Sequence, residues 1–377
     1  MFKFCRSIKI DWYLVIPATL LSFFALFTLI SFGEVSTRFI KQSVWILFGL
    51  VLFIFLQRTN LYFLKNRKFI LIMYALSIIS LLILFVSGHM AKGAQSWIKL
   101  GFLSIQPTDP AKLVLIILLA KYFSKRYVEI SVFKHVFISG IYAGVLCLLV
   151  LLQPDFGSAM TIFSIWAGII FISGLSKKHI LILGTISILI LSLGWQYAFK
   201  QYQKDRIINF IHPMRDIRGS GYNQYQAVIA VGSGQILGKG VGYGTQSKLK
   251  FLPEYQTDFI FSAFAEEWGF VGVFIVLILF LMILLRILFV AMKADTNFDA
   301  LIAAGVFIFF GVHILINIGM NLGIMPITGI PLPFMSYGGS HILIEFISLG
   351  IVSNISMRKK NTGVHMNEFK NEFLGFN

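Results

Sequence analysis

The chain has little charge for its size. Only 13% of its 377 residues are charged, whereas 57% are hydrophobic. A soluble domain could neither bury nor solvate so much apolar surface, and the composition therefore excludes that class. The sequence predicts an integral membrane protein.

Cysteines and strand-like alternation are scarce as well. Cys5 falls before the first apolar run and Cys147 inside a later one, where neither meets an oxidising aqueous phase. No disulfide framework is therefore expected. The apolar runs also lack the period-two alternation of a membrane β-barrel. The spanning segments are therefore expected to be α-helices, which satisfy the backbone polar groups in lipid through internal hydrogen bonds.

Apolar runs recur along the whole chain. About 20 apolar residues span a bilayer as a helix. The runs therefore predict an all-α, polytopic membrane protein of about ten transmembrane helices, with a long extracytoplasmic loop between spans seven and eight. The first run has no convincing small-residue cleavage site and is expected to remain as a signal anchor. The expected spans are 11–31, 39–57, 69–88, 109–124, 135–152, 157–175, 180–198, 258–285, 300–322 and 340–356.

Acidic residues are few, with 16 against 32 lysines and arginines and a net charge of +16. Nineteen basic residues fall in the segments expected inside and only five in the short segments expected outside, so the positive-inside rule places both termini in the cytoplasm. The charge then reflects topology and attraction to anionic membrane lipid, and no nucleic-acid motif accompanies it. Residues 1–360 are expected to form a single transmembrane domain, and 361–377 a cytoplasmic tail.

The long outer loop, 199–257, breaks this charge rule because it carries eight basic residues. It also holds eight glycines between Gly219 and Gly244. Glycine lets backbone N–H groups approach a ligand, and lysine and arginine add positive charge, a combination that suits phosphate. A flexible basic loop that touches lipid headgroups is the alternative. A nucleotide-binding P-loop is not expected, because its GK[ST] signature is absent.

Three carboxylates stand at the start of the eighth apolar run. Asp258 is expected in the first turn of that helix, at the water boundary. Asp258, Ser262 and Glu266 recur at intervals of four and share nearly one helical face. Ionisable groups inside a membrane are costly and by default mark a functional site. We therefore expect Glu266 and Glu267 to be protonated, hydrated or paired with a cation such as Lys112.

The shorter outer segments hold further candidates. Asp109 and Lys112 stand three apart at a helix start, close enough to pair as a structural salt bridge or to touch a ligand. Pro110 between them suits a first helical turn. Trp97 fits an interfacial aromatic residue. Asp155 is expected to cap the sixth span.

The last outer segment, 323–340, contains three prolines and four glycines. Irregular backbone at membrane depth is tolerated only where it is buried in protein or lines a cavity. We therefore expect this segment to form a second wall beside Asp258.

The residues described so far leave two classes of protein: a transporter of a phosphorylated or lipid-linked solute, and an enzyme that acts on such a solute at the outer face.

Seven motifs favour the enzyme. Together they resemble the SEDS family in order, spacing and topology, and the match covers essentially every span. The stretches GTQSKLKFLPE and GAQSWI are closer to the elongation members of that family, the RodA type, than to its division members. The motifs are GAQSWIKLG (93–101), QPTDPAK (106–112), QPDFGSA (153–159), RIINFIHP (206–213), GSGYNQ (219–224), GKGVGYGTQSKLKFLPEYQTDFIFSAFAEEWGFVG (238–272) and GIPLPFMSYGGS (329–340).

The resemblance implies a peptidoglycan glycosyltransferase of the bacterial cytoplasmic membrane that serves cell elongation and cell-shape maintenance. Its substrates would be lipid II and the growing glycan strand at the outer face, and its partner a class B penicillin-binding protein, the transpeptidase. Asp258 matches the family's essential acid. It would deprotonate the 4-hydroxyl of the acceptor sugar, or hold a divalent cation, Mg²⁺ or Mn²⁺, that helps to do so. No other cofactor is implied.

The resemblance also implies substrate contacts at several outer positions. The basic residues Lys112, Arg206 and Lys239 would neutralise the pyrophosphate leaving group. The full set of expected substrate-binding residues is Lys41, Gln42, Trp97, Asp109, Lys112, Arg206, Lys239, Gln246 and Glu254.

Four positions depart from the family pattern. Lys41 stands where arginine is usual, which keeps the charge but loses the bidentate fork. Asp109 replaces a glutamate, and Gln235 replaces a glycine. His341 replaces a serine, and either it only fills its site or it makes the pocket sensitive to pH.

A lipid II flippase, or another polyisoprenoid-lipid transporter, is the alternative. A transporter is expected to show inverted repeats and polar residues that reach the cytoplasmic side. The chain shows no clear repeat, and its motifs gather at the outer boundary. These features favour glycosyl transfer.

Overall fold

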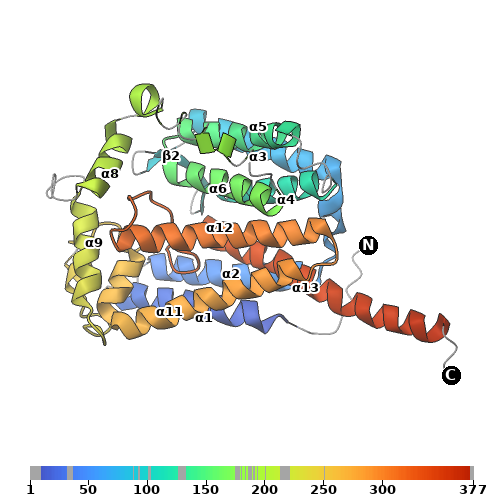
Figure 1. Cartoon of the computed structure of the whole chain (residues 1–377). Coiled ribbons are helices and arrows are strands. Elements are labelled where there is room, and N and C mark those ends of the chain that lie inside the picture. Colours follow the sequence, from blue (N-terminus) through green and yellow to red (C-terminus); the bar gives the residue numbers. More distant parts are fainter. Residues whose placement is uncertain are drawn as a thin grey trace.

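The computed structural model of the chain is almost entirely helical (Figure 1). Every expected span except 180–198 coincides with a helix. The described residues are 10–31, 37–87, 89–91, 94–100, 103–125, 133–174, 194–199, 201–212, 221–249 and 251–373, with scattered positions between 179 and 192. The bundle helices are α1 (Trp12–Ser31), α2 (Thr37–Arg58), α3 (Arg67–Ser87), α4 (Thr108–Ser124), α5 (Phe133–Leu152), α6 (Phe156–Ile172), α11 (Ile260–Met292), α12 (Asn297–Asn321) and α13 (Gly339–Phe373).

The all-α, polytopic prediction is confirmed, but the count of ten spans is not. Seven of the described helices are long and apolar enough to cross a membrane. Helix α6 is apolar but has 17 residues, and α4, also of 17 residues, carries charged side chains. Of the expected span 180–198, the structure describes scattered positions between 181 and 192 and the π-helical turn Gly194–Ala198, so it does not test whether the span is one continuous helix.

Helix α12 occupies the middle of the bundle, where it packs against α4, α6 and α11. Helices α3 to α6 lie on one side of it and α1, α2, α11 and α13 on the other (Figure 1). Small residues allow close contacts between helices, as is common in membranes. A Cβ on Gly305 would lie 2.5 Å from Ile116, and one on Gly49 would lie 2.4 Å from Phe346.

A small antiparallel sheet, not expected from the sequence, joins α3 to α4. Its strands are β1 (His89–Ala91), β2 (Ala94–Leu100) and β3 (Leu103–Ile105), in the order β1-β2-β3. Strands this short contain too few alternating positions to be distinguished from a loop by sequence pattern. Backbone pairing, such as that between Ile98 and Ile105, holds these strands together.

The described residues of the expected outer loop 199–257 include three helices: α8 (Gln201–Ile211), α9 (Tyr222–Ser233) and α10 (Thr245–Lys248). Helix α9 packs against α11 and α12, and α8 and α9 lie at one end of the bundle (Figure 1). Much of this segment is therefore built onto the transmembrane helices.

Ion pairs join the segments expected in the cytoplasm at the other end of the bundle. Lys65 Nζ lies 3.4 Å from Asp299 Oδ2, and Arg358 lies 3.9 Å from the other oxygen of that carboxylate. Arg286 lies 2.7 Å from Asp11. Segments that were all expected on one side of the membrane therefore lie together.

Helix α13 runs on to Phe373, through most of the segment expected as a tail. It continues past the ends of the neighbouring helices (Figure 1). The last four residues, 374–377, lie outside the described part of the chain.

Candidate active site

Asp258 lies in the turn that leads into α11, not in its first helical turn, so the predicted helix start was two residues early. The helix begins at Ile260. In a longer helix the N–H of Ser262 would donate to the carbonyl of Asp258. Instead it donates to Asn321 Oδ1 (3.1 Å), while the carbonyl of Asp258 accepts from the side-chain amides of Asn317 and Asn321, both at 3.1 Å. Asparagines of α12 thus hold the turn through its main chain and leave the carboxylate of Asp258 partly exposed.

The proline- and glycine-rich segment lies against this turn, as expected for a second wall. Ser336 Oγ donates to the carbonyl of Thr257 at 2.7 Å. Asn317 donates to the carbonyl of Ile330, also at 2.7 Å. A Cβ on Gly329 would lie 3.8 Å from Asp258 Oδ2. The segment therefore reaches the carboxylate itself.

Helix α2 anchors the same segment from another side. The side chain of Gln42 is buried; its Nε2 donates to the carbonyl of Ser336, and its Oε1 accepts from the N–H of Gly338, both at 3.2 Å. Both ends of this amide are thus used within the protein. Lys41 beside it is exposed.

Arg38, one turn before Gln42, also reaches the site. Its guanidinium donates to the side-chain oxygen of Gln256, and the main-chain carbonyl of Gln256 accepts from the N–H of Tyr337 at 2.9 Å. Burial raises the pKa of the Tyr337 phenol, and the positive charge of Arg38 opposes that shift. Arg38 is one of the five basic residues counted in the short segments expected outside, and this contact was not predicted.

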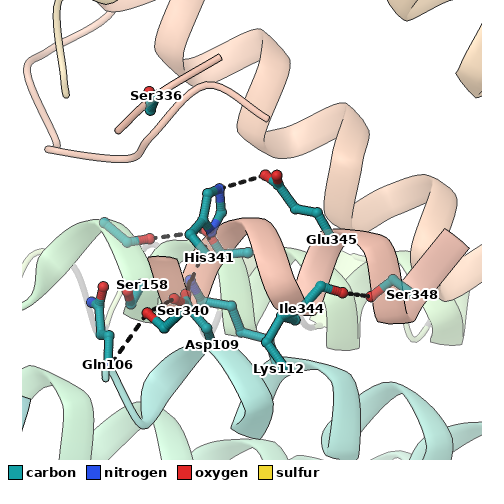
Figure 2. Close-up of polar contacts among 12 residues, drawn as sticks. Gln106, Asp109, Lys112, Ser158, Ser336, Ser340, His341, Ile344, Glu345 and Ser348 are labelled. Carbon is teal, nitrogen blue, oxygen red and sulfur yellow. Dashed lines mark hydrogen bonds and ion pairs between the residues drawn. The ribbon is translucent and has the colours of Figure 1, made fainter. Parts of the chain in front are cut away.

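Five ionisable side chains meet inside the bundle and are named here the ionic cluster; Figure 2 labels four of them, Asp109, Lys112, His341 and Glu345. Asp109 and Lys112 come from α4, His313 from α12, and His341 and Glu345 from α13. None of the five is more than 3% exposed. Buried charges are tolerated where they are paired, so the cluster is held together by its own contacts.

The predicted pair within the cluster is confirmed. Lys112 Nζ lies 3.3 Å from Asp109 Oδ1, and Pro110 occupies the first turn of α4 as expected. The pairing also corrects one prediction, because Lys112 does not neutralise Glu266 or Glu267.

Hydrogen bonds extend from the ionic cluster toward the start of α6. Ser340 Oγ donates to Asp109 Oδ2 at 3.2 Å and accepts from the N–H of Gln106 at 3.3 Å. Gln106 Nε2 donates to Asp155 at 3.1 Å. Asp155 accepts from the N–H of Ser158 at 3.0 Å, which confirms it as the N-cap of α6. Three motifs distant in sequence thus form one polar network.

The cation that pairs with Glu266 is Lys239 of the glycine-rich loop. Its Nζ lies 2.7 Å from Glu266 Oε1, which also accepts from the N–H groups of Thr245 (2.8 Å) and Gln246 (3.1 Å). Glu266 is fully buried. The carboxylate thus fixes Lys239 and the start of α10 relative to α11. Glu266 therefore belongs to a structural network.

The same loop pairs with α11 through main-chain atoms. Gly269, with a φ of 64°, interrupts the helical conformation of α11. The N–H of Lys239 donates to the carbonyl of Glu266 (3.0 Å), and the N–H of Phe270 donates to the carbonyl of Gln235 (2.9 Å). A helix break in a membrane needs such partners for the freed backbone groups.

Replacing Gly238 by alanine is expected to lower the free energy of unfolding by about 1–3 kcal/mol, because the backbone conformation at this position is unfavourable for a residue with a Cβ. Gly238 has a φ of +81°, and a Cβ there would lie 2.1 Å from the carbonyl oxygen of Glu267. Gly232, within α9, is the matched control, because a Cβ there meets nothing within 4 Å. Gly232→Ala is expected to stabilise the protein by about 0.4–1 kcal/mol. Denaturation of the purified variants in detergent checks both, and equal effects would contradict this account.

The remaining predicted residues lie on separate elements. Trp97 is on β2 and Arg206 on α8, and both side chains are partly buried. Glu254 is exposed in the turn that contains Asp258 and accepts from Thr257 Oγ1 at 2.9 Å. Gln246 is partly buried, and its main-chain N–H donates to Glu266.

Sequence reasoning missed the polar residues of α12. His313, Asn317 and Asn321 recur at intervals of four in an otherwise apolar helix, and all three are fully buried. That spacing places them on one face. The same reasoning that selected Asp258, Ser262 and Glu266 could have found them.

The fold and the site define a multi-pass membrane protein whose polar network lies at one end of a helical bundle. The chain matches the model of the FtsW/RodA/SpoVE family of cell cycle proteins over residues 9–361 and belongs to that family.

The chain is similar in sequence to other members of this family. It is 36% identical to the peptidoglycan glycosyltransferase MrdB of Escherichia coli over 288 residues, or 76% of this chain and 78% of MrdB. It is 32% identical to stage V sporulation protein E of Bacillus subtilis over 324 residues, or 84% of this chain and 86% of that protein.

Solved structures agree with this assignment. The rod shape determining protein RodA of Thermus thermophilus matches with a TM-score of 0.69 and 28% identity, over 92% of this chain and 97% of that one. A chain from a peptidoglycan synthase complex that coordinates polymerization and crosslinking matches with a TM-score of 0.79 and 29% identity, over 93% and 98%. The resemblance found from the motifs is confirmed.

Proposed function

We propose that this protein is a peptidoglycan glycosyltransferase that polymerises glycan strands from lipid II and serves cell elongation and cell-shape maintenance. Its relatives include proteins named peptidoglycan glycosyltransferases. The observation that carries the proposal is the turn at Asp258, where a partly exposed carboxylate stands on a backbone held by α12 and by the 323–338 segment.

In this reaction Asp258 takes the proton from the 4-hydroxyl of the acceptor sugar. The hydroxyl oxygen forms a bond to the anomeric carbon of the donor, and the bond from that carbon to the pyrophosphate oxygen breaks. Undecaprenyl pyrophosphate leaves with the bonding electrons. The rigid main-chain support suits this role, because a general base must stay within hydrogen-bond reach of the proton it removes.

The pyrophosphate needs positive charge as it leaves. Lys239 is suited to this task, because its side chain is 30% exposed although it contacts Glu266. Arg206 on α8 is a second candidate. The Lys112 side chain is only 2% exposed and is paired with Asp109, so in this conformation it does not face the leaving group.

A divalent cation fits the site only together with substrate. The described residues contain no group of three histidine, cysteine or acidic side chains that could hold a metal ion. Mg²⁺ commonly binds through one or two carboxylates plus substrate phosphates. Asp258 would be the protein's ligand, and the cation would supply charge stabilisation to the pyrophosphate.

Removing divalent cations with EDTA is expected to stop polymerisation by the purified protein, and Mg²⁺ or Mn²⁺ is expected to restore it. The physical reason is that Asp258 and the pyrophosphate both carry negative charge, which a divalent cation would offset. Glycan chains are measured on gels after chelation and after each metal is added back. Undiminished synthesis in EDTA would leave Asp258 with the role of base alone.

We also propose an inner-membrane location, cytoplasmic termini and a class B penicillin-binding protein as partner. The cytoplasmic termini are supported by the basic residues and ion pairs at the end of the bundle away from Asp258. The partner is supported by the similarity to a chain of a peptidoglycan synthase complex that coordinates polymerization and crosslinking.

The test is polymer formation from labelled lipid II by the purified protein with its transpeptidase partner. Moenomycin is added to suppress contaminating polymerases, and Asp258→Asn is compared with the native chain. The proposal is supported if the native protein makes glycan chains and the Asp258→Asn variant does not. If no polymer forms but lipid II crosses vesicles in a protein-dependent way, the transporter alternative is correct.

A further inference from the structure

Glu345 supports an unfavourable backbone conformation in the segment beside Asp258. It lies on α13, is fully buried, and its Oε2 accepts from the N–H of Phe334 at 2.8 Å. Phe334 has a φ of +59°, a region that bulky side chains rarely adopt. Such a conformation persists only where its surroundings determine it strongly, and the carboxylate of Glu345 is part of those surroundings.

His341 places Glu345 under the influence of the rest of the ionic cluster. Its Nε2 lies 2.7 Å from Glu345 Oε1, and its Nδ1 lies 3.7 Å from Asp109 Oδ1 (Figure 2). The first contact meets the distance of a hydrogen bond but not its geometry, so it is a close polar contact. The ring also stacks on His313, with centroids 5.1 Å apart. The side chain of His341 is therefore held from α4, α12 and α13.

The segment that contains Phe334 also holds the turn of Asp258. Two residues beyond Phe334, Ser336 Oγ accepts from the N–H of Leu332 and donates to the carbonyl of Thr257, both at 2.7 Å. Thr257 directly precedes Asp258. A continuous set of contacts therefore runs from His341 through Glu345 and residues 332–336 to the turn.

We propose that His341 and Glu345 act as a positioning pair for glycosyl transfer. Glu345 holds the backbone of Phe334, His341 orients Glu345, and residues 332–336 hold the turn that carries Asp258. Neither side chain contacts substrate in this role. The inference rests on the proposed function only in that Asp258 is the group being positioned.

The test compares Glu345→Ala and Glu345→Gln with the native chain in lipid II polymerisation. Glu345→Ala loses the acceptor for the N–H of Phe334, and kcat is expected to fall by up to about 100-fold, the usual cost of a misplaced reactive group. KM for lipid II is expected to change little. Glu345→Gln keeps an acceptor oxygen and is expected to recover part of the loss. Ser348→Ala, which removes only a bond to the carbonyl of Ile344 on α13, is the matched control and should leave kcat unchanged.

A second measurement does not depend on activity. Amide hydrogen exchange of residues 253–259 and 330–338 is expected to accelerate in Glu345→Ala but not in Ser348→Ala. Glu345→Gln and His341→Asn are also combined, and the double variant is expected to lose less than the product of the single losses, because contacting residues are coupled.

Three results would overturn the pairing: native kcat in a folded Glu345→Ala protein, unchanged exchange in both segments, or independent effects of the two residues. If the native protein makes no polymer, the proposed function fails instead. The exchange measurement then still decides whether Glu345 holds the segment.

Discussion

Asp258→Asn is expected to lower the rate of glycan polymerisation by about 10²–10⁴-fold, the usual contribution of a positioned general base. Asparagine has nearly the same shape but cannot take the proton of the acceptor hydroxyl. The turn should keep its conformation, because Asn317 and Asn321 bind the carbonyl of residue 258 and not its side chain. The measurement is the initial rate of polymer formation from labelled lipid II.

Asp295→Asn provides the matched control for this variant. It makes the same chemical change at an exposed position just before α12. Its rate should equal that of the native protein. Equal polymer formation by Asp258→Asn and the native chain would show that Asp258 is not the catalytic group, whereas equal losses in both variants would point to a general effect of charge.

Lys112→Met is expected to destabilise the protein by about 3–5 kcal/mol, because it leaves a buried carboxylate without its cation. The side chains of Asp109 and Lys112 are each only 2% exposed. Methionine has a similar length and no charge, so the loss should come from electrostatics and not from a cavity. Denaturation in detergent gives the free energy of unfolding.

Lys125→Met tests whether this effect depends on burial. Lys125 follows the last turn of the same helix and is exposed, so its removal should change stability by less than about 0.5 kcal/mol. The double variant Asp109→Asn with Lys112→Met should cost less than Lys112→Met alone, because no uncompensated charge remains. A double variant as unstable as the sum of the two single variants would contradict the importance of the pair.

Local features of the site could be predicted from sequence. The Asp109–Lys112 pair follows from a spacing of three on one helix, and the Asp155 cap follows from its place before an apolar run. Both interactions join residues that are close in the chain. Their geometry is fixed by the helix itself.

Features that depend on distant segments could not be predicted in this way. Glu266 was expected to be protonated, hydrated or paired with a cation such as Lys112. That it pairs with Lys239 is decided by where the glycine-rich loop packs on α11. The start of α11 was placed two residues early because an asparagine of α12 takes the first helical hydrogen bond. Glu345 was not selected at all, since its partner Phe334 belongs to an irregular segment.

The sequence by itself determined that this protein is a helical membrane protein, where most of its helices lie, and which residues match the family's motifs. These properties follow from hydrophobicity along the chain, because lipid requires apolar helices whose backbone bonds are internal. Only the tertiary structure decided which polar groups meet. Gln42 and Ser336, for example, are 294 residues apart in the chain and hydrogen-bond beside Asp258. Such contacts depend on the packing of several helices at once, and no local spacing encodes them.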